Sequence, residues 1–438
     1  MSLIQQGFLP NRQLLANVID VDFAAQTVSI KHSRGAIVLL DFRAAFPSIA
    51  HDYLWDVLKA IGVPPAMVST LQLFYTNNRH FIRVDGKLFP SFSAENGVRQ
   101  GCPLSGIIFV LCIDLLLRKV SSVIGSDGIT RGYADDTAIV IQDYVKELPA
   151  LARIFIEFED ISGLGLNVEK TVFIPLWQST SAKSVSCLLK ELCPPWGGFI
   201  VSDRGKYLGF MVGPGAGSSS WKGALAKYEA RSLQWASKHL GLYMTTFAYR
   251  VYIQPVLMFV AQLCSPPEEL KPLFPWALRR LAPGPGNWIL DKDLINLRSY
   301  GMRQEFADPQ VLCMAAKLRV VKFVVPDVAA RYQQLLQTQS EYFGRPFGNW
   351  HYSSMVGVLA QNLEHLSNKG INLRTVMHFN HVRGTSHKLP TKSFQTACFD
   401  LIRAKTQPAY DTIARVRSKL QRLCRGLLLN ALSGTSTD

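Results

Sequence analysis

The chain has 438 residues, of which 48% are hydrophobic and 18% charged, a composition that excludes an intrinsically disordered protein. Its formal net charge is +15, and this excess is unevenly distributed. Residues 1–180 hold 15 Lys/Arg against 17 Asp/Glu, whereas the remaining 32 basic and 15 acidic residues lie beyond position 180. Basic surface attracts phosphate backbones, so the second part is a candidate nucleic-acid surface. A charge that only keeps the protein in solution explains the same count equally well.

Cysteine spacing and hydropathy exclude several further classes. The eight cysteines form no CxxC pair and no Cys/His cluster with zinc-ligand spacing, which indicates free thiols in a reducing compartment. The N-terminus lacks the basic and apolar regions of a signal peptide. The two longest apolar stretches, 104–117 and 251–264, are short and interrupted. The sequence therefore predicts no membrane span.

The first elements in chain order mix strands and helices. Residues 36–42 form a short apolar run typical of a buried strand, and residues 51–60 show helical spacing. A second helix is expected to open at Pro64-Pro65, and the Asp85-Gly86 pair predicts a hairpin over 81–92. Residues 105–118 are apolar almost all round, which predicts a buried helix.

Further along, residues 129–142 predict a second hairpin, with its tight turn at an acidic pair. A helix over 146–161 and a strand over 168–176 follow, so the first 180 residues have an α+β pattern with antiparallel pairing. Residues 213–220 are rich in Gly and Ser and indicate a linker. Beyond them the pattern is mainly helical, with amphipathic stretches at 221–240, 309–322, 327–340, 355–367 and 409–430.

Three carboxylates stand out as candidates for chemistry. Asp41 ends the predicted strand 36–42, and Asp135-Asp136 sit at the tip of the hairpin 129–142. Carboxylates at the ends of adjacent strands repel one another unless a cation lies between them, and oxygen ligands without His or Cys favour Mg²⁺. Two such ions can activate an attacking hydroxyl and stabilise a departing pyrophosphate. Read alone, an Asp-Asp pair is more often a polar turn.

Six motifs in a fixed order change that interpretation. They are Gln6-Gly7-Phe8-Leu9-Pro10-Asn11-Arg12, Leu40-Asp41-Phe42-Arg43-Ala44-Ala45-Phe46, Gly97-Val98-Arg99-Gln100-Gly101-Cys102-Pro103-Leu104-Ser105, Tyr133-Ala134-Asp135-Asp136, Leu166-Asn167-Val168-Glu169-Lys170-Thr171 and Lys206-Tyr207-Leu208-Gly209. Together they resemble the reverse transcriptase of non-LTR (LINE-type) retrotransposons, with kinship to group II intron enzymes. The resemblance covers residues 5–210.

The resemblance implies a role for each matched position. Asp41, Asp135 and Asp136 would be the catalytic acids and would hold two Mg²⁺ ions, which Mn²⁺ could replace. The dNTP site would comprise the backbone carbonyl of Phe42, the sugar-facing ring of Phe46, Gln100-Gly101 against the nascent base pair, and Lys170 near the pyrophosphate. Tyr207, Leu208 and Gly209 would grip the primer end. Read alone, Phe46 fits core packing equally well, and Lys170 is more often a solvated side chain.

The resemblance also implies a fold and a domain order. The expected fold is a right-hand polymerase palm with an antiparallel sheet and flanking helices, followed by a mainly helical thumb and C-terminal region. Palm and partial fingers would span 1–212, a thumb-like region 213–290, and a basic helical extension 291–438. Relatives extend upstream into finger strands, so an N-terminally truncated copy is expected.

Aromatic and basic residues interleave after position 220, where rings could stack on bases and cations could hold phosphates. Core packing of the rings explains the pattern equally well. The ring positions are Trp221, Trp235, Tyr243, Tyr249 and Tyr252, and the basic positions are Lys222, Lys227, Arg231, Lys238 and Arg250.

The implied activity is RNA-directed DNA polymerisation. Its partners would be an RNA template, a DNA primer or target and dNTPs, with no membrane partner, in the nucleus. Two alternatives remain open from the residues. One is a catalytically inactive nucleic-acid-binding remnant, and the other is an RNA-dependent RNA polymerase, against which Phe46 and Gln100-Gly101 argue.

Overall fold

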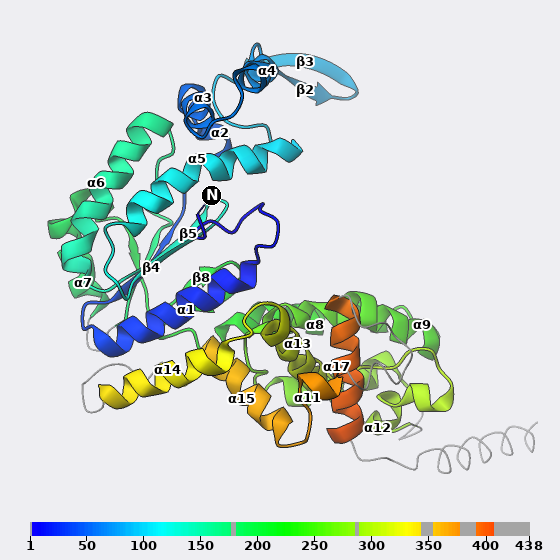
Figure 1. Cartoon of the computed structure of the whole chain (residues 1–438). Helices are drawn as coiled ribbons and strands as arrows, with labels where there is room; N and C mark the ends of the chain where they lie inside the picture. The colour runs from blue at the N-terminus through cyan, green and yellow to red at the C-terminus, as the bar shows by residue number, and fades with distance from the viewer. Residues whose placement is uncertain (1, 177–180, 285–288, 343–353, 377–390, 407–438) are drawn as a thin grey trace, which may run out of the picture. The chain divides into compact units, whose positions relative to one another are not determined.

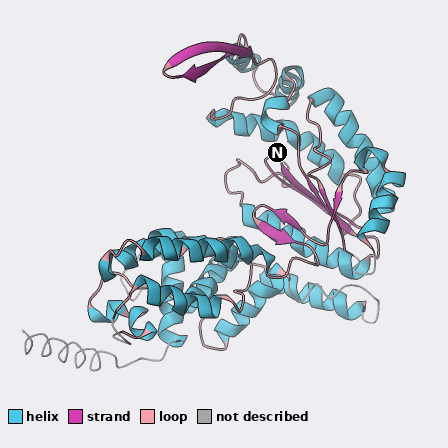
Figure 2. Ribbon diagram, turned by 180° about the vertical axis from the view of Figure 1, so that it is seen from behind, coloured by secondary structure: helices cyan, strands magenta, loops and turns pink. Residues whose placement is uncertain are grey.

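A computed structural model describes residues 2–176, 181–284, 289–342, 354–376 and 391–406, without the side chains of 391–393. The chain divides into two compact units. The first unit comprises residues 1–217 together with 327–357, and the second comprises 218–326 together with 358–438. The first unit is α+β and the second is helical, so the expected fold class is confirmed (Figures 1 and 2).

The first unit is built on a five-stranded sheet of order β4-β5-β1-β6-β7. Its strands are β4 (Ile129–Tyr133), β5 (Asp136–Ile141), β1 (Ala36–Leu40), β6 (Val172–Pro175) and β7 (Ile200–Val201). Only the β6–β7 pair is parallel. The predicted hairpin over 129–142 is confirmed, as are the strands predicted over 36–42 and 168–176. Every residue of β1 is buried, which explains its unbroken apolar run.

Helices cover both faces of this sheet (Figure 1). Alternate residues such as Val38 and Ile139 join the core formed with α5 (Pro103–Ser121) and α6 (Tyr144–Ser162). The other face packs against α1 (Leu14–Lys31). The ends of α6 follow local chemistry: the Asp143 side chain accepts a hydrogen bond from the Val145 N–H, and Gly163 ends the helix with φ +73°. The predicted helices over 105–118 and 146–161 are confirmed.

Smaller elements complete the first unit. As predicted, α3 (His51–Ala60) and α4 (Pro65–Tyr75) are helices, and β2 (Arg79–Val84) pairs with β3 (Lys87–Ser93) around Asp85-Gly86. The others are α2 (Ala45–Ser48), α7 (Ala182–Leu192), η1 (Pro194–Trp196) and the hairpin of β8 (Gly205–Tyr207) and β9 (Phe210–Val212).

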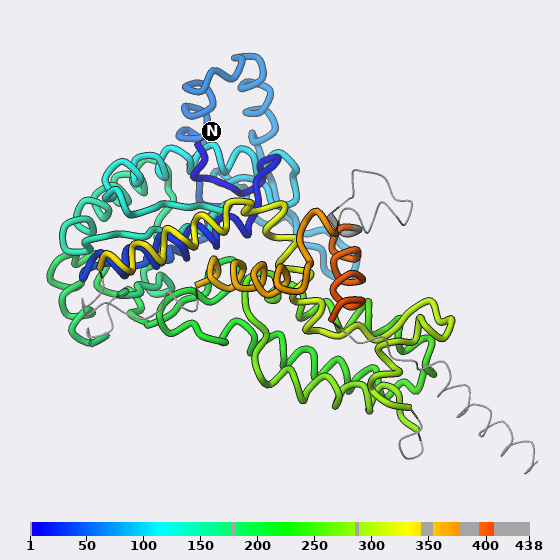
Figure 3. Tube along the Cα trace, turned by 60° about the horizontal axis from the view of Figure 1, so that its bottom comes forward, coloured from blue at the N-terminus to red at the C-terminus, as the bar shows by residue number. Residues whose placement is uncertain are grey.

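The chain returns to the first unit after residue 326. Helix α14 (Val328–Glu341), yellow in Figure 3, runs beside the blue helix α1 and packs against it. Asp20 of α1 links the two helices and the sheet, because its carboxylate lies 2.7 Å from Arg331 of α14 and 2.9 Å from Arg131 of β4. The first unit is therefore discontinuous in sequence.

The second unit consists of helices around two hydrophobic cores. One core gathers Trp221, Tyr228, Tyr249 and Phe306, and the other gathers residues such as Leu318 and Phe394. The helical elements are α8 (Ser219–Ala236), α9 (Gly241–Ala248), the π-helix η2 (Tyr249–Ile253), α10 (Pro255–Met258), η3 (Val260–Gln262), α11 (Leu270–Leu281), α12 (Asp291–Leu294), η4 (Leu297–Tyr300), α13 (Pro309–Phe323), α15 (Met355–Ser367) and α17 (Thr391–Thr406).

Two predictions from hydropathy can be compared with this structure. Among the described residues, no helix is both long enough and apolar enough to cross a membrane. The helix predicted over 409–430 lies outside the described residues. The amphipathic stretches predicted at 221–240, 309–322, 327–340 and 355–367 all form helices.

Candidate active site

The acidic pair lies at the turn between β4 and β5. β4 ends at Tyr133 and β5 begins at Asp136, so only Ala134 and Asp135 connect the two strands. Ala134 has φ +58°, in the left-handed region that alanine rarely adopts. The Thr137 hydroxyl donates to the carbonyl oxygen of Asp135 at 3.3 Å. A tight turn with one strained residue therefore presents both carboxylates at the end of the hairpin.

Sheet register brings Asp41 to the same end. β1 pairs antiparallel with β5 so that Leu40 lies opposite Thr137. Asp41, one residue beyond β1, is thereby placed beside Asp136, the first residue of β5. Although Asp136 as a residue is exposed, neighbouring atoms shield its carboxyl group from water, and this desolvation raises its pKa. The charges of Asp135 and Asp41 raise the pKa of Asp136 further.

This mutual repulsion bears on whether the acids suit a metal. Carboxylate oxygens are the donors that Mg²⁺ and Mn²⁺ prefer, and a divalent cation would relieve the repulsion that raises the pKa of Asp136. Within the described part of the chain, no group of three or more His, Cys, Asp or Glu side chains is arranged to hold a metal ion. The three acids therefore fit a divalent cation by donor type and charge, while their side chains do not converge on one point.

The motif at 97–105 lies against the segment that follows Asp41. The Val98 N–H donates to the Phe46 carbonyl at 2.8 Å, and the Gly97 N–H donates to the Ile49 carbonyl at 2.7 Å. The Phe46 ring stacks on Phe109 of α5 with centroids 4.5 Å apart. The structure thus brings Phe46 together with the start of the 97–105 motif.

Gln100 and Gly101, further along the same motif, are both exposed. Gly101 has φ +87°, and a Cβ atom added there would meet open space within the described structure. The left-handed backbone favours glycine at this position, and nothing described covers it. The pair is therefore accessible to a ligand.

The motif at 166–171 closes against Asp41 from another side. The Asn167 N–H donates to the Asp41 carbonyl at 2.7 Å, and Phe42 forms an isolated antiparallel bridge with Leu166. The Phe42 side chain is buried, so any contact with a ligand would be made by its backbone carbonyl. Lys170 is exposed, and its N–H donates to the Asn167 carbonyl in the turn that precedes β6.

The motif at 206–209 forms the turn between β8 and β9. Tyr207 is only 3% exposed, and its hydroxyl lies 3.4 Å from the Arg131 carbonyl of β4. Leu208 and Gly209 have φ +47° and +89° and are partly exposed. In this unit Tyr207 supports the sheet, and the turn at Leu208-Gly209 is the part of the motif that a ligand could reach.

Two residues that sequence reasoning did not select hold the acidic turn from behind. Gln5 is fully buried and hydrogen-bonds both backbone groups of Ala134. Asn17 of α1, also fully buried, donates to the Gly132 carbonyl at 2.9 Å. A polar residue surrounded by apolar neighbours, as in Leu15-Ala16-Asn17-Val18-Ile19, was the signal in the sequence.

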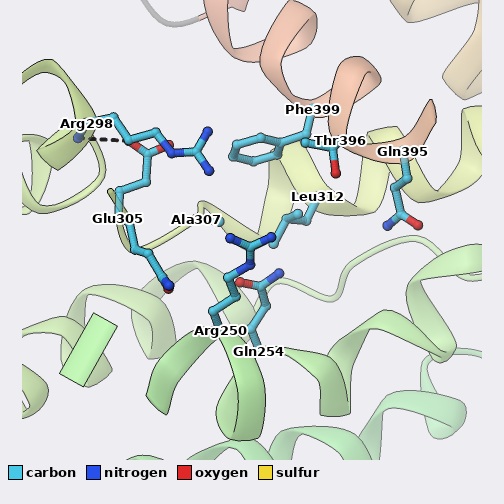
Figure 4. Close-up of a pocket in the computed structure, with 10 residues that line it drawn as sticks. Arg250, Gln254, Arg298, Glu305, Ala307, Leu312, Gln395, Thr396 and Phe399 are labelled. Atoms are coloured by element: carbon cyan, nitrogen blue, oxygen red, sulfur yellow. Dashed lines mark hydrogen bonds and ion pairs between the residues drawn. The ribbon is translucent and has the colours of Figure 1, made fainter. Parts of the chain in front are cut away.

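A separate cavity of about 220 Å³ lies within the second unit (Figure 4). Arg250 of η2 and Gln254 face it from one side, and Phe399 of α17 faces it from another. Arg298 and Glu305 border it and interact with each other. None of the residues that line it belongs to the six motifs, so it is distinct from the site around the three acids.

Comparison with known proteins gives the same assignment for the first half of the chain. Residues 1–212 match the family described as "Reverse transcriptase (RNA-dependent DNA polymerase)". A "Retrovirus-related Pol polyprotein from type-2 retrotransposable element R2DM" of Drosophila melanogaster is 35% identical over 172 residues, which are 38% of this chain and 16% of that protein. A type-1 retrotransposable element R2 polyprotein of Popillia japonica is 27% identical over 171 residues, which are 36% of this chain and 27% of that protein.

The chain thus spans well under two thirds of the length of these relatives. Among solved structures, apo telomerase from Candida tropicalis is 12% identical, with 80% of this chain and 55% of that chain covered. The TM-score is 0.37, a likeness too low to carry an argument about the fold.

Proposed function

We propose, since residues 1–212 belong to the reverse transcriptase family, that this chain carries the RNA-directed DNA polymerase of a non-LTR retrotransposon. The observation that supports the activity most directly is the sheet register. It places Asp41 and the Asp135-Asp136 turn at one end of adjacent strands, where the three acids raise one another's energy. Divalent cations, which this family uses, would offset that repulsion.

The proposed reaction joins a primer 3′-hydroxyl to the α-phosphorus of a dNTP. The new bond links the 3′-oxygen to phosphorus, the bond to the bridging oxygen breaks, and pyrophosphate leaves with its electron pair. Two Mg²⁺ ions, which Mn²⁺ could replace, would lower the pKa of the hydroxyl and neutralise the leaving group when bound. Asp41, Asp135 and Asp136 would hold them.

Other residues of the chain would bind and orient the substrates. Phe46, beside Val98, would lie under the deoxyribose, and exposed Gln100-Gly101 would lie against the nascent base pair. The ammonium group of exposed Lys170 would neutralise or protonate the pyrophosphate. The partly exposed turn at Leu208-Gly209 would contact the primer end while Tyr207 anchors it to β4.

The second unit would contribute binding surface for the RNA template and DNA primer. Of the interleaved aromatic residues, Trp221 and Tyr249 are core residues with 1% and 0% exposure. Tyr243 and Tyr252 are exposed, and Tyr252 stacks on Trp235 with centroids 4.8 Å apart. Arg231 donates to the Tyr252 carbonyl at 2.6 Å, which places a cation beside this pair. Exposed rings next to cations suit single-stranded nucleic acid.

Primer extension by the full chain tests this proposal. With a primed RNA template, dNTPs and Mg²⁺, the wild-type chain is expected to extend the primer. Asp135→Asn is expected to lower the rate by more than about 100-fold, because a lost charge at a developing phosphate charge costs about that much or more. The matched control is Asp56→Asn on the surface of α3, which is expected to keep the wild-type rate.

The same assay separates the alternatives. Extension with NTPs in place of dNTPs would identify an RNA polymerase instead. Salt-dependent binding of the primed template without extension would identify an inactive binding protein. Equal rates for Asp135→Asn and wild type would show that the acidic turn is not the catalytic site.

A further inference from the structure

Gln5 is a buried amide directed at the backbone of the acidic turn. Its side chain has no exposed surface, and both ends of its amide are used. The oxygen accepts from the Ala134 N–H at 2.9 Å and from the Gly7 N–H at 2.8 Å. The nitrogen donates to the Ala134 carbonyl at 3.1 Å. One side chain therefore fixes both backbone groups of the residue that precedes Asp135.

Ala134 is the position of the turn that most needs fixing. Its φ of +58° lies in the left-handed region, where a residue with a Cβ atom loses about 1–2 kcal/mol. Two buried hydrogen bonds contribute free energy of similar size, roughly 0.5–1.5 kcal/mol each. Without them the Ala134 peptide could relax, and Asp135 and Asp136, which follow it directly, would change direction.

The segment that carries Gln5 is itself anchored to the same hairpin. The Gly132 N–H donates to the Ile4 carbonyl at 3.0 Å, and the Gln6 N–H donates to the Gly132 carbonyl at 2.8 Å. Gly7 lies so close that an added Cβ atom would come within 2.3 Å of the Ala134 nitrogen. The Gln5 amide is thus held at a fixed position behind the turn.

We infer that Gln5 is a positioning residue, which holds the strained Ala134 peptide so that Asp135 and Asp136 present their carboxylates to divalent cations. The inference rests on the proposed function, since it assigns those acids to the metals of nucleotidyl transfer. Gln5 acts through the backbone of the turn and touches neither metal nor substrate. Its loss should therefore weaken metal binding and lower kcat, with little change in the KM for dNTP.

The test replaces the Gln5 amide by a side chain of similar size that forms no such hydrogen bonds. Gln5→Met is expected to weaken Mn²⁺ binding, measured by calorimetry on the full chain, by roughly tenfold, the equivalent of about 1.4 kcal/mol. The Mg²⁺ concentration for half-maximal extension should rise by a similar factor. The matched control is Gln6→Met, because the Gln6 amide bonds only the nearby Leu3 carbonyl. It should match wild type in both measurements.

Two further variants separate positioning from a general loss of structure. Ala134→Gly removes the cost of positive φ, so Mn²⁺ affinity in the double variant Gln5→Met/Ala134→Gly should recover in part. Gly7→Ala presses a methyl group onto the Ala134 nitrogen and should weaken Mn²⁺ binding as Gln5→Met does. It keeps the question testable should Gln5→Met not fold, as judged by thermal unfolding.

The outcomes for the inference and for the proposed function differ. A wild-type chain that extends primers, with Gln5→Met and Gly7→Ala binding Mn²⁺ as tightly as wild type, would overturn the inference and leave the function intact. A wild-type chain that binds Mn²⁺ but extends no primer would overturn the proposed function. In that case, weaker Mn²⁺ binding by Gln5→Met would still support the role of Gln5.

Discussion

Phe46 lies in a row of aromatic rings at the edge of the candidate site. It stacks on Phe109 and meets Phe8 edge-on, with centroids 4.5 and 6.3 Å away. The ring is only partly buried, so one part of it packs and another can face a ligand. The two interpretations of Phe46 from sequence, core packing and sugar contact, are therefore compatible in one residue.

Replacing Phe46 by Ala tests the sugar contact. Removing the ring would remove the clash with a 2′-hydroxyl, so the preference for dNTP over NTP should fall by roughly 10- to 100-fold, the range that small steric changes produce in a pocket. The ratio of the two kcat/KM values measures this preference. Phe74→Ala, at an exposed phenylalanine of α4, is the control. Unchanged selectivity in an active Phe46→Ala variant would refute the contact.

At the residue scale, sequence motifs identified the side chains that could meet a substrate, but they did not reveal those that support them. Asp41, Asp135 and Asp136 were found because charged residues next to apolar runs stand out. Gln5 was not, because its role depends on lying opposite Ala134, about 130 positions away in sequence. The positive φ at Ala134, which makes Gln5 important, leaves no trace in the residue type.

Helix α1 shows the same limit at the scale of an element. It was not predicted, although it covers one whole face of the sheet. The helix is buried on several sides, and it carries buried polar residues, among them Asn17, Asp22 and Gln26. Buried polar side chains interrupt the apolar periodicity by which amphipathic helices are recognised. By contrast, α3 and the hairpin of β4 and β5 follow from short local patterns, and both were predicted.

Asp22 gives α1 a dependence on pH. Its carboxyl group is buried and accepts a hydrogen bond from the Met355 N–H at 2.8 Å, at the start of α15. Burial raises the pKa of Asp22 from 3.8 to about 7, although hydrogen bonds from Met355 and Gln26 lower it. Between these values the folded state holds a proton that the unfolded state has lost. Stability should therefore fall as pH rises from about 4 to about 7 and then level off.

Asp22→Asn should remove this fall while keeping an acceptor for Met355. At pH 8 the variant is expected to be more stable than wild type by on the order of 2 kcal/mol, since each unit of pKa shift corresponds to about 1.4 kcal/mol. Urea unfolding at several pH values measures the difference, with exposed Asp56→Asn as the control. Parallel pH profiles for Asp22→Asn and wild type would contradict the assignment.

At the scale of the whole molecule, charge separates the two halves of the sequence. The excess of basic residues lies beyond position 180, which includes the entire second unit. Arg250 of that unit is exposed and faces the cavity of Figure 4. Composition alone could not tell a binding surface from a solubilising one, and the exposure of Tyr243, Tyr252 and Arg250 favours binding.

The salt dependence of nucleic-acid binding tests this interpretation. The logarithm of affinity for a primed template should fall linearly with the logarithm of salt concentration. Arg250→Ala should weaken binding and reduce that slope by about 1, as expected for one lost phosphate contact. Lys59→Ala on α3, where Lys59 already pairs with Asp56, should leave the slope unchanged. Identical slopes for all three proteins would exclude Arg250 from the nucleic-acid surface.

The return of α14 to α1 has a consequence for inheritance. All six motifs end by residue 209, yet the body that holds them also needs residues 327–357, where Val328 and Leu335 are buried. A stop codon anywhere between positions 218 and 326 would spare every motif and still remove α14 and the partner of Asp20. Intact motifs in a shortened gene copy are therefore a poor guide to whether its product folds. For this polymerase, the reading frame must survive well past its chemistry.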